Sequence, residues 1–190
     1  MPDHLVDSLQ TKMGYPMLQK IDPNTQTVIE PASTKENRFG QAAIPAVLTA
    51  LYKYSDTDDG AGNILQGNTP VDLTTLLFKE NKDDIIGMIA SYSSCSTGYA
   101  EEKTSLIAAT AVHIIKQELP VTATIHDVRK YLAGQKNDIL LYLQAELQIG
   151  ELLHENTLDD RTNKMEGPLS SLMHTIGDQF SGGEISKEPS

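Results

Sequence analysis

The segment from residue 99 to residue 118 carries apolar side chains around nearly its whole circumference, which constrains the fold more than any other stretch. Its apolar residues are Leu106, Ile107, Ala108, Ala109, Ala111, Val112, Ile114 and Ile115. A helix that is apolar on every side is one that other helices surround. We therefore expect an all-α, multihelical globular bundle built around a buried central helix at about residues 99–118.

The other helices are predicted from single apolar faces. Residues 36–54 repeat apolar side chains at spacings of three and four, and the repeat continues in phase across Pro45. We expect one helix, kinked where Pro45 removes a backbone hydrogen bond, although a break before Pro45 is the alternative. Similar patterns predict helices at 3–13, 71–78, 82–93, 125–134, 135–147 and 168–180. Thr124 and Asp127 form a capping-box pattern, and Gly134 is a candidate helix end.

Composition agrees with a helical class. Aromatic residues make up only 5% of the chain and tryptophan is absent, so the core must be mainly aliphatic. β-Sandwiches favour β-branched and aromatic residues, and no convincing strand pattern occurs. We divide the chain into an N-terminal helix and extended arm (1–35), a helical core (36–148), C-terminal helices (149–180) and a tail that is disordered by composition (181–190).

Charge and cysteine content favour a cytoplasmic protein. Fifteen basic and 26 acidic residues give a formal charge of −11, which repels nucleic acid and anionic lipid. Cys95 is the single cysteine, so no intramolecular disulfide forms. The N-terminus lacks a signal-peptide pattern, and the apolar run 106–115 is shorter than the ~20 residues that span a bilayer. We expect no nucleic-acid partner and no membrane insertion.

The acidic segment YSDTDDGAGN (54–63) resembles a calcium loop only superficially. An EF-hand loop needs oxygen ligands at its first, third and fifth positions and a glutamate at the twelfth. Counting from Asp56 places Gly60 at the fifth position and Gly67 at the twelfth. We interpret the segment as a helix terminator in which Gly60 or Gly62 has positive φ, and we predict no metal site.

Cys95 and His113 are the candidates for a reactive group. Cys95 precedes a predicted helix N-terminus, where a thiolate is stabilised, but no nucleophile motif accompanies it. No two of the five histidines lie three or four residues apart, as a helical metal site requires. A small residue in a turn and a buried, hydrogen-bonded imidazole are the alternatives for Cys95 and His113. We expect no catalytic residue and no cofactor.

Residues 124–143 also permit a helix-turn-helix interpretation. Gly134 would lie in the turn, with Arg129, Lys130 and Lys136 nearby. The second helix carries few basic side chains and would present leucine and tyrosine to a DNA groove, which disfavours this function.

Three segments together resemble the YidB-like family of uncharacterised bacterial proteins. They are AAIPAVLTALYKYSDTDDGAGNIL, DIIGMIASYSSCSTGYAEEKTSLIAATAVHIIKQEL and YLAGQKNDILLYL, and the resemblance covers roughly residues 36–148. Cys95 stands where that family usually has glycine, and Thr110-Ala111 replaces its proline-leucine pair. The resemblance implies an all-helical fold without established catalytic residues.

Function is therefore expected at the terminal segments. The last predicted helix has one apolar side, made by Leu169, Leu172, Met173, Ile176 and Phe180. It can pack on its own domain or bind a partner. We expect a non-enzymatic interaction or scaffold protein of the bacterial cytoplasm, such as a subunit of a larger assembly, that joins a protein partner or copies of itself. The alternatives are an enzyme with a cryptic pocket that uses Cys95 or His113, and a DNA-binding helical protein.

Overall fold

A computed structural model describes residues 4–21 and 34–143 of the 190-residue chain. Within these residues the fold is all-α, as predicted, with seven α-helices, one 3-10 turn and no β-strand. The helices are α1 (Leu5–Met13), α2 (Lys35–Tyr54), α3 (Asp58–Gln66), α4 (Leu73–Phe78), α5 (Lys82–Ser93), α6 (Thr97–Glu118) and α7 (Ile125–Leu140), and the 3-10 turn η1 is Lys79–Asn81.

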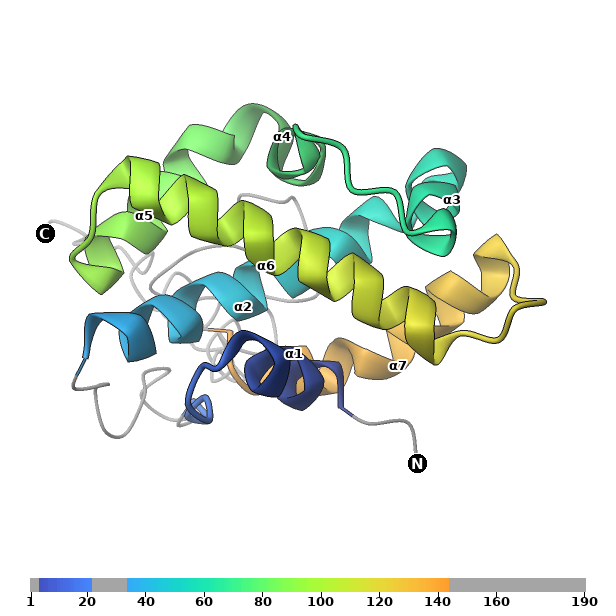
Figure 1. Cartoon of the computed structure of the whole chain (residues 1–190), viewed down its shortest axis with the longest axis horizontal. Coiled ribbons are helices and arrows are strands. Elements are labelled where there is room, and N and C mark those ends of the chain that lie inside the picture. Colours follow the sequence, from blue (N-terminus) through green and yellow to red (C-terminus); the bar gives the residue numbers. More distant parts are fainter. Residues whose placement is uncertain (1–3, 22–33, 144–190) are drawn as a thin grey trace, which may run out of the picture.

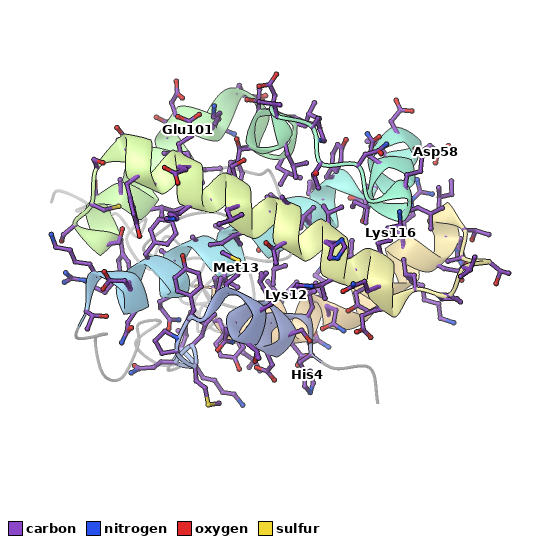
Figure 2. All side chains as sticks on the ribbon, in the orientation of Figure 1. His4, Lys12, Met13, Asp58, Glu101 and Lys116 are labelled. Carbon is purple, nitrogen blue, oxygen red and sulfur yellow. The ribbon has the colours of Figure 1, made fainter. Side chains whose placement is uncertain are left out.

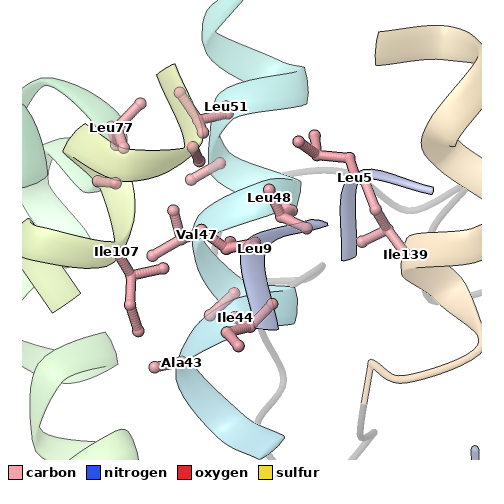
Figure 3. Packing of buried hydrophobic residues seen from close by; sticks show 14 of the residues in the cluster. Leu5, Leu9, Ala43, Ile44, Val47, Leu48, Leu51, Leu77, Ile107 and Ile139 are labelled. Carbon is pink, nitrogen blue, oxygen red and sulfur yellow. The ribbon is translucent and has the colours of Figure 1, made fainter. Parts of the chain in front are cut away.

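The helices form one bundle around α2 and α6. Figure 1 shows α6 crossing in front of α2, with α4 and α5 on one side, α1 and α7 on the other, and α3 at one end. Both α2 and α6 pack against α1, α4 and α5 as well as against each other. Figure 3 shows the resulting core, in which Val47 of α2 lies between Ile107 of α6 and Leu9 of α1.

The most deeply enclosed helix is α2 rather than the predicted one. Every residue of α2 from Phe39 to Leu51 is buried. The helix at 99–118 forms and buries Ile107 and Ile115 completely, but its outer side faces water, where Leu106 is 49% exposed. Five alanines and glycines between residues 40 and 50 let neighbouring helices approach α2 closely on all sides. Small residues and the polar residues Gln41 and Thr49 do not produce a continuous apolar pattern. The sequence therefore does not reveal that α2 is buried on all sides.

Pro45 lies inside α2, which is continuous as predicted. A proline has no N–H to donate to the carbonyl of Gln41 one turn earlier. The buried side chain of Gln41 instead reaches the N-terminal segment, where it accepts from the Gln19 N–H (2.8 Å) and donates to the Gln19 carbonyl (3.0 Å).

Residues 4–21 of the N-terminal segment pack into the core. Leu5 and Leu9 of α1 are fully buried, and Leu18 is 8% exposed. The Ile21 N–H donates to the Leu141 carbonyl beyond α7 at 2.9 Å. The boundary predicted at residue 35 therefore does not separate packing units in the described part of the chain.

α7 begins as predicted but continues through Gly134. The Thr124 N–H donates to the Asp127 carboxylate at 2.8 Å, and this hydrogen bond holds the pKa of Asp127 below its ordinary value. Gly134 lies in the middle of Ile125–Leu140 and does not end a helix. The turn that a helix-turn-helix motif needs is absent at Gly134.

Candidate functional site

The acidic segment joins two helices, as predicted, but by a different local structure. α2 ends at Tyr54, and the Thr57 hydroxyl caps α3 by accepting from the Gly60 N–H at 3.0 Å. Because this cap starts α3 before the glycines, Gly60 and Gly62 are helical and neither has positive φ. The expectation of a glycine helix end was wrong, and Gly67 supplies the left-handed cap of α3 instead, with φ of 71°.

Gly60 is required by close contact between α3 and the end of α2. A Cβ atom at Gly60 would lie 1.9 Å from the carbonyl oxygen of Tyr54. A Cβ atom at Gly62, half a turn further on, would meet nothing within 4 Å. The two glycines therefore differ: Gly60 permits the helix junction, and Gly62 leaves open space at the surface.

That open space belongs to a groove of about 670 Å³ between the end of α2, one face of α3 and α4. This volume is in the range of about 300–1,000 Å³ that is typical of ligand sites. The residues that line it are Lys53, Tyr54, Thr57, Asp58, Asp59, Gly62, Asn63, Gln66, Thr75, Leu76, Leu77 and Lys79. We call it the α3 groove.

The spacing of the α3 residues explains how one side of the groove is built. Asp59, Gly62, Asn63 and Gln66 recur at intervals of three and four, so they share one helix face. The Asn63 side-chain amide donates to the Tyr54 hydroxyl at 2.8 Å, which holds this face against the end of α2. The lining therefore offers amide and hydroxyl groups at fixed positions.

Two cations from outside the groove brace α3. Arg129 of α7 donates to the Asp58 carboxylate at 2.6 Å and to the Ser55 carbonyl at 2.9 Å. Lys116 of α6 donates to the Gln66 carbonyl at 2.5 Å, near the C-terminal end of α3. Figure 2 shows Asp58 and Lys116 at the α3 end of the molecule. Besides Asp58, which Arg129 engages, the lining contains one further carboxylate, Asp59, and two lysines, Lys53 and Lys79.

Lys79 lines the groove with an unusual backbone. It follows α4 with φ of 51° and ψ of −131°. These angles match the first central position of a type II′ turn, where glycine, asparagine and aspartate predominate. Among non-glycine residues in the described part of the chain, Ser94 is the other one with positive φ.

Cys95 and His113 do not form a catalytic pair. Cys95 is half-buried beside a cavity of about 300 Å³ whose lining residues are Lys35, Glu36, Phe39, Ser94, Ser96 and Tyr99. The Cys95 sulfur lies 3.2 Å from the Ser93 hydroxyl. His113 is exposed on α6, contrary to the expectation of a core imidazole. His113 lies 16 positions after Thr97, which is about 24 Å along the helix, so the imidazole cannot reach the thiol.

The remaining candidate site residues do not come together at one site in the described part of the chain. His4 contacts the Asp138 carboxylate at 2.8 Å on the surface, and His126 is exposed on α7. Across residues 4–21 and 34–143, no three histidine, cysteine, aspartate or glutamate side chains are grouped as metal ligands would be. In the same residues no helix has the length and hydropathy needed to cross a membrane. The predicted partner-binding residues Leu169, Leu172, Met173, Ile176 and Phe180 lie outside the described residues.

Sequence reasoning missed the groove because its lining comes from three elements. The helical spacing of Asp59, Gly62, Asn63 and Gln66 can be read from the sequence, but the contributions of Lys53 and Lys79 depend on how α2 and α4 pack around α3.

The site defines the chain as an all-α domain with a polar surface groove. No family model, curated protein or solved structure matches the chain.

Proposed function

We propose that this chain is a non-enzymatic, cytoplasmic interaction protein that binds a peptide segment of a protein partner in the α3 groove. The observation that carries the proposal is the chemistry of the lining. The Thr75 hydroxyl and the Gln66 side-chain N–H groups can pair with the backbone of a bound peptide, while Thr57 and Asn63 already form hydrogen bonds with Tyr54 that fix the shape of the groove. Leu76, an exposed leucine in the lining, supplies an apolar contact for a side chain.

The arrangement supports binding better than catalysis. The groove lining contains neither histidine nor cysteine, and its carboxylate Asp58 is held by Arg129. An enzyme that uses Cys95 or His113 would need a base close to the thiol, and the Cys95 cavity is lined by Lys35 and Glu36 but by no histidine. The YidB-like resemblance stays a prediction and carries no weight in this proposal.

The test is selection of peptides from a random dodecapeptide library on the full chain, followed by affinity measurements on synthesised hits. Gly62→Phe should fill the groove, because Gly62 lines it and has open space around its Cβ. Gly87→Phe on α5 is the matched control, since Gly87 is also helical and also has nothing within 4 Å of a built Cβ. We expect at least tenfold weaker binding for Gly62→Phe and unchanged binding for Gly87→Phe. Failure to select any peptide, or equal effects of the two variants, contradicts the proposal.

Self-association through the C-terminal segment is a separate part of the proposed interaction role. It rests on the apolar pattern of Leu169, Leu172, Met173, Ile176 and Phe180. Light scattering after size-exclusion chromatography should show that Leu172→Asp lowers the oligomeric state of the full chain, while Ser171→Asp leaves it unchanged. A monomeric wild-type chain overturns this part without affecting the groove.

A further inference from the structure

We infer that two cations outside the α3 groove, Arg129 of α7 and Lys116 of α6, are positioning residues that hold α3 and thereby set the affinity of the groove for a peptide. The inference rests on the proposed function and names the residues on which that site depends. It is carried by the anchoring of the two groove walls and by the contacts of the two cations with the ends of α3.

The two walls of the groove differ in how firmly the core holds them. α4 is attached by three large buried side chains, those of Leu73, Leu77 and Phe78. The buried residues of α3 are Gly60, Ala61 and Ile64, so Ile64 is the one large side chain that this described helix buries. An element with few buried apolar contacts opens more easily than the rest of a fold. Polar contacts therefore contribute more to the position of α3 than to that of α4.

Arg129 holds the N-terminal end of α3. Its guanidinium donates to the Ser55 carbonyl at 2.9 Å, to the Asp56 carbonyl at 3.1 Å and to the Asp58 carboxylate at 2.6 Å. Ser55 and Asp56 follow α2, and Asp58 is the first residue of α3, so one side chain spans the junction. A cation is favoured at the carbonyls that end a helix, and a guanidinium has enough donors for all three oxygens. α7 thus fixes the direction in which α3 leaves α2.

Lys116 holds the C-terminal end of α3. Its ammonium group donates to the carbonyl of Gln66, the last residue of the helix, at 2.5 Å. The lysine side chain passes closely over Gly67, where a built Cβ atom would lie 2.5 Å from Lys116 Cδ. Gly67 also has φ of 71°, so the turn and the close approach both require glycine. α6 thus holds the end of α3 that is opposite to Arg129.

The helix held in this way forms one wall of the groove. Asp59, Gly62, Asn63 and Gln66 line the groove from one face of α3, so a displacement of α3 moves this whole wall. α3 packs chiefly against α6 and α7, the two helices that carry the cations. If the binding position of α3 is populated only in part, the apparent affinity falls in proportion. Loss of either cation should therefore weaken binding without removing any group from the groove lining.

The first measurement is hydrogen exchange of the full chain without peptide. Arg129→Met and Lys116→Met remove the donors and keep an aliphatic side chain. Lys130→Met is the control, because Lys130 is the exposed neighbour of Arg129 on α7 and does not line the groove. We expect α3 amides to exchange at least tenfold faster in the two test variants than in the control. α5, at the opposite end of the bundle in Figure 1, should exchange equally in all three.

Two exchange results overturn the inference. Equal exchange of α3 in the three variants would show that the cations do not hold this helix. Exchange of α5 that accelerates together with α3 would show that the cations stabilise the whole fold and do not position one wall.

The second measurement is the affinity of each variant for the peptides selected on the wild-type chain. We expect about tenfold weaker binding by Arg129→Met and Lys116→Met, and wild-type binding by Lys130→Met. Saturating peptide should slow α3 exchange in the two test variants, because a ligand that needs α3 in place also favours that position. Faster α3 exchange with unchanged affinity overturns the inference and leaves the proposed function standing. A failed selection on the wild-type chain removes the proposed function, and the inference with it.

Discussion

Single residues determine how closely the elements around the groove can approach. At Gly60 the distance from a built Cβ to the Tyr54 carbonyl oxygen is 1.9 Å, so the junction of α2 and α3 requires the absence of a side chain. At Tyr15 the phenol stacks beside Phe39 with ring centroids 6.3 Å apart, and the ring leans against Gly40 of α2. At both positions the packing of α2 therefore depends on a neighbouring glycine having no side chain.

Gly60→Ala should destabilise the fold, and Gly62→Ala should not. The alanine at residue 60 must displace backbone, and overpacking of this kind lowers the free energy of unfolding by about 1–3 kcal/mol. The same change at residue 62 meets open space and gains helix propensity, about 0.5–1 kcal/mol. Urea unfolding of the two variants measures both effects, and equal stabilities would show that the close contact with Tyr54 does not exist.

Tyr15 should titrate well above an ordinary tyrosine. Burial, followed by the charges of Tyr99 and Glu36, raises the pKa of Tyr15 from 10.0 to about 12. The folded state therefore favours the neutral phenol, so this contribution to stability is complete below pH 10 and is lost as the pH rises through about 12. The difference between the alkaline absorbance titrations of wild type and Tyr15→Phe should show one group ionising near pH 12, and a midpoint near pH 10 would contradict the burial of Tyr15.

At the scale of elements, α1 is held by a distant side chain. Its N-cap residue, His4, makes no side-chain cap, so the first N–H groups of the helix lack a local acceptor. The Gln135 side-chain oxygen of α7 accepts from the Leu5 N–H at 2.9 Å, across 130 residues of chain. Gln10 similarly accepts from the Leu18 N–H at 2.9 Å. Buried Gln135 and Gln41 thus attach the N-terminal segment to the bundle, and the Gln10 bond folds that segment back on α1.

Gln135→Leu should weaken this attachment although it adds apolar surface. The Leu5 N–H would be buried without an acceptor, which lowers the free energy of unfolding by about 1–3 kcal/mol. Gln117→Leu on α6 is the control, because the exposed Gln117 side chain accepts a hydrogen bond from the exposed Lys12 at 3.3 Å and caps no helix N–H group of the described residues. Hydrogen exchange should show faster exchange of α1 amides in Gln135→Leu and unchanged exchange in Gln117→Leu; the reverse order would remove the proposed capping role.

At the scale of the molecule, α1 to α7 share one hydrophobic core and should unfold together. Leu9 of α1 and Leu132 of α7 are both fully buried in it. A shared core makes unfolding cooperative, whereas an N-terminal appendage would unfold separately. The two termini of the described core are therefore part of the same stability unit.

Leu9→Ala and Leu132→Ala test this cooperativity. Each should lower the free energy of unfolding by about 2–5 kcal/mol, and far-UV and near-UV circular dichroism should follow one coincident transition in both variants. An early transition confined to Leu9→Ala would show that α1 unfolds independently of α2–α7.

The sequence predicts which helices form and where several of them end, because these features depend on residues that are close together in the chain. The apolar repeat of 3.6 residues identified α2 across Pro45 and the end of α1 at Met13, after which Gly14 has φ of 71°. The pairing of Thr124 with Asp127 likewise depends on residues three apart. Only the tertiary structure decided which helix is enclosed, where α1 docks and where the groove lies. Alanine and glycine are compatible with both core and surface, so the burial of α2, the contact at Gly60 and the turn at Lys79 depend on neighbours that lie far away in the chain.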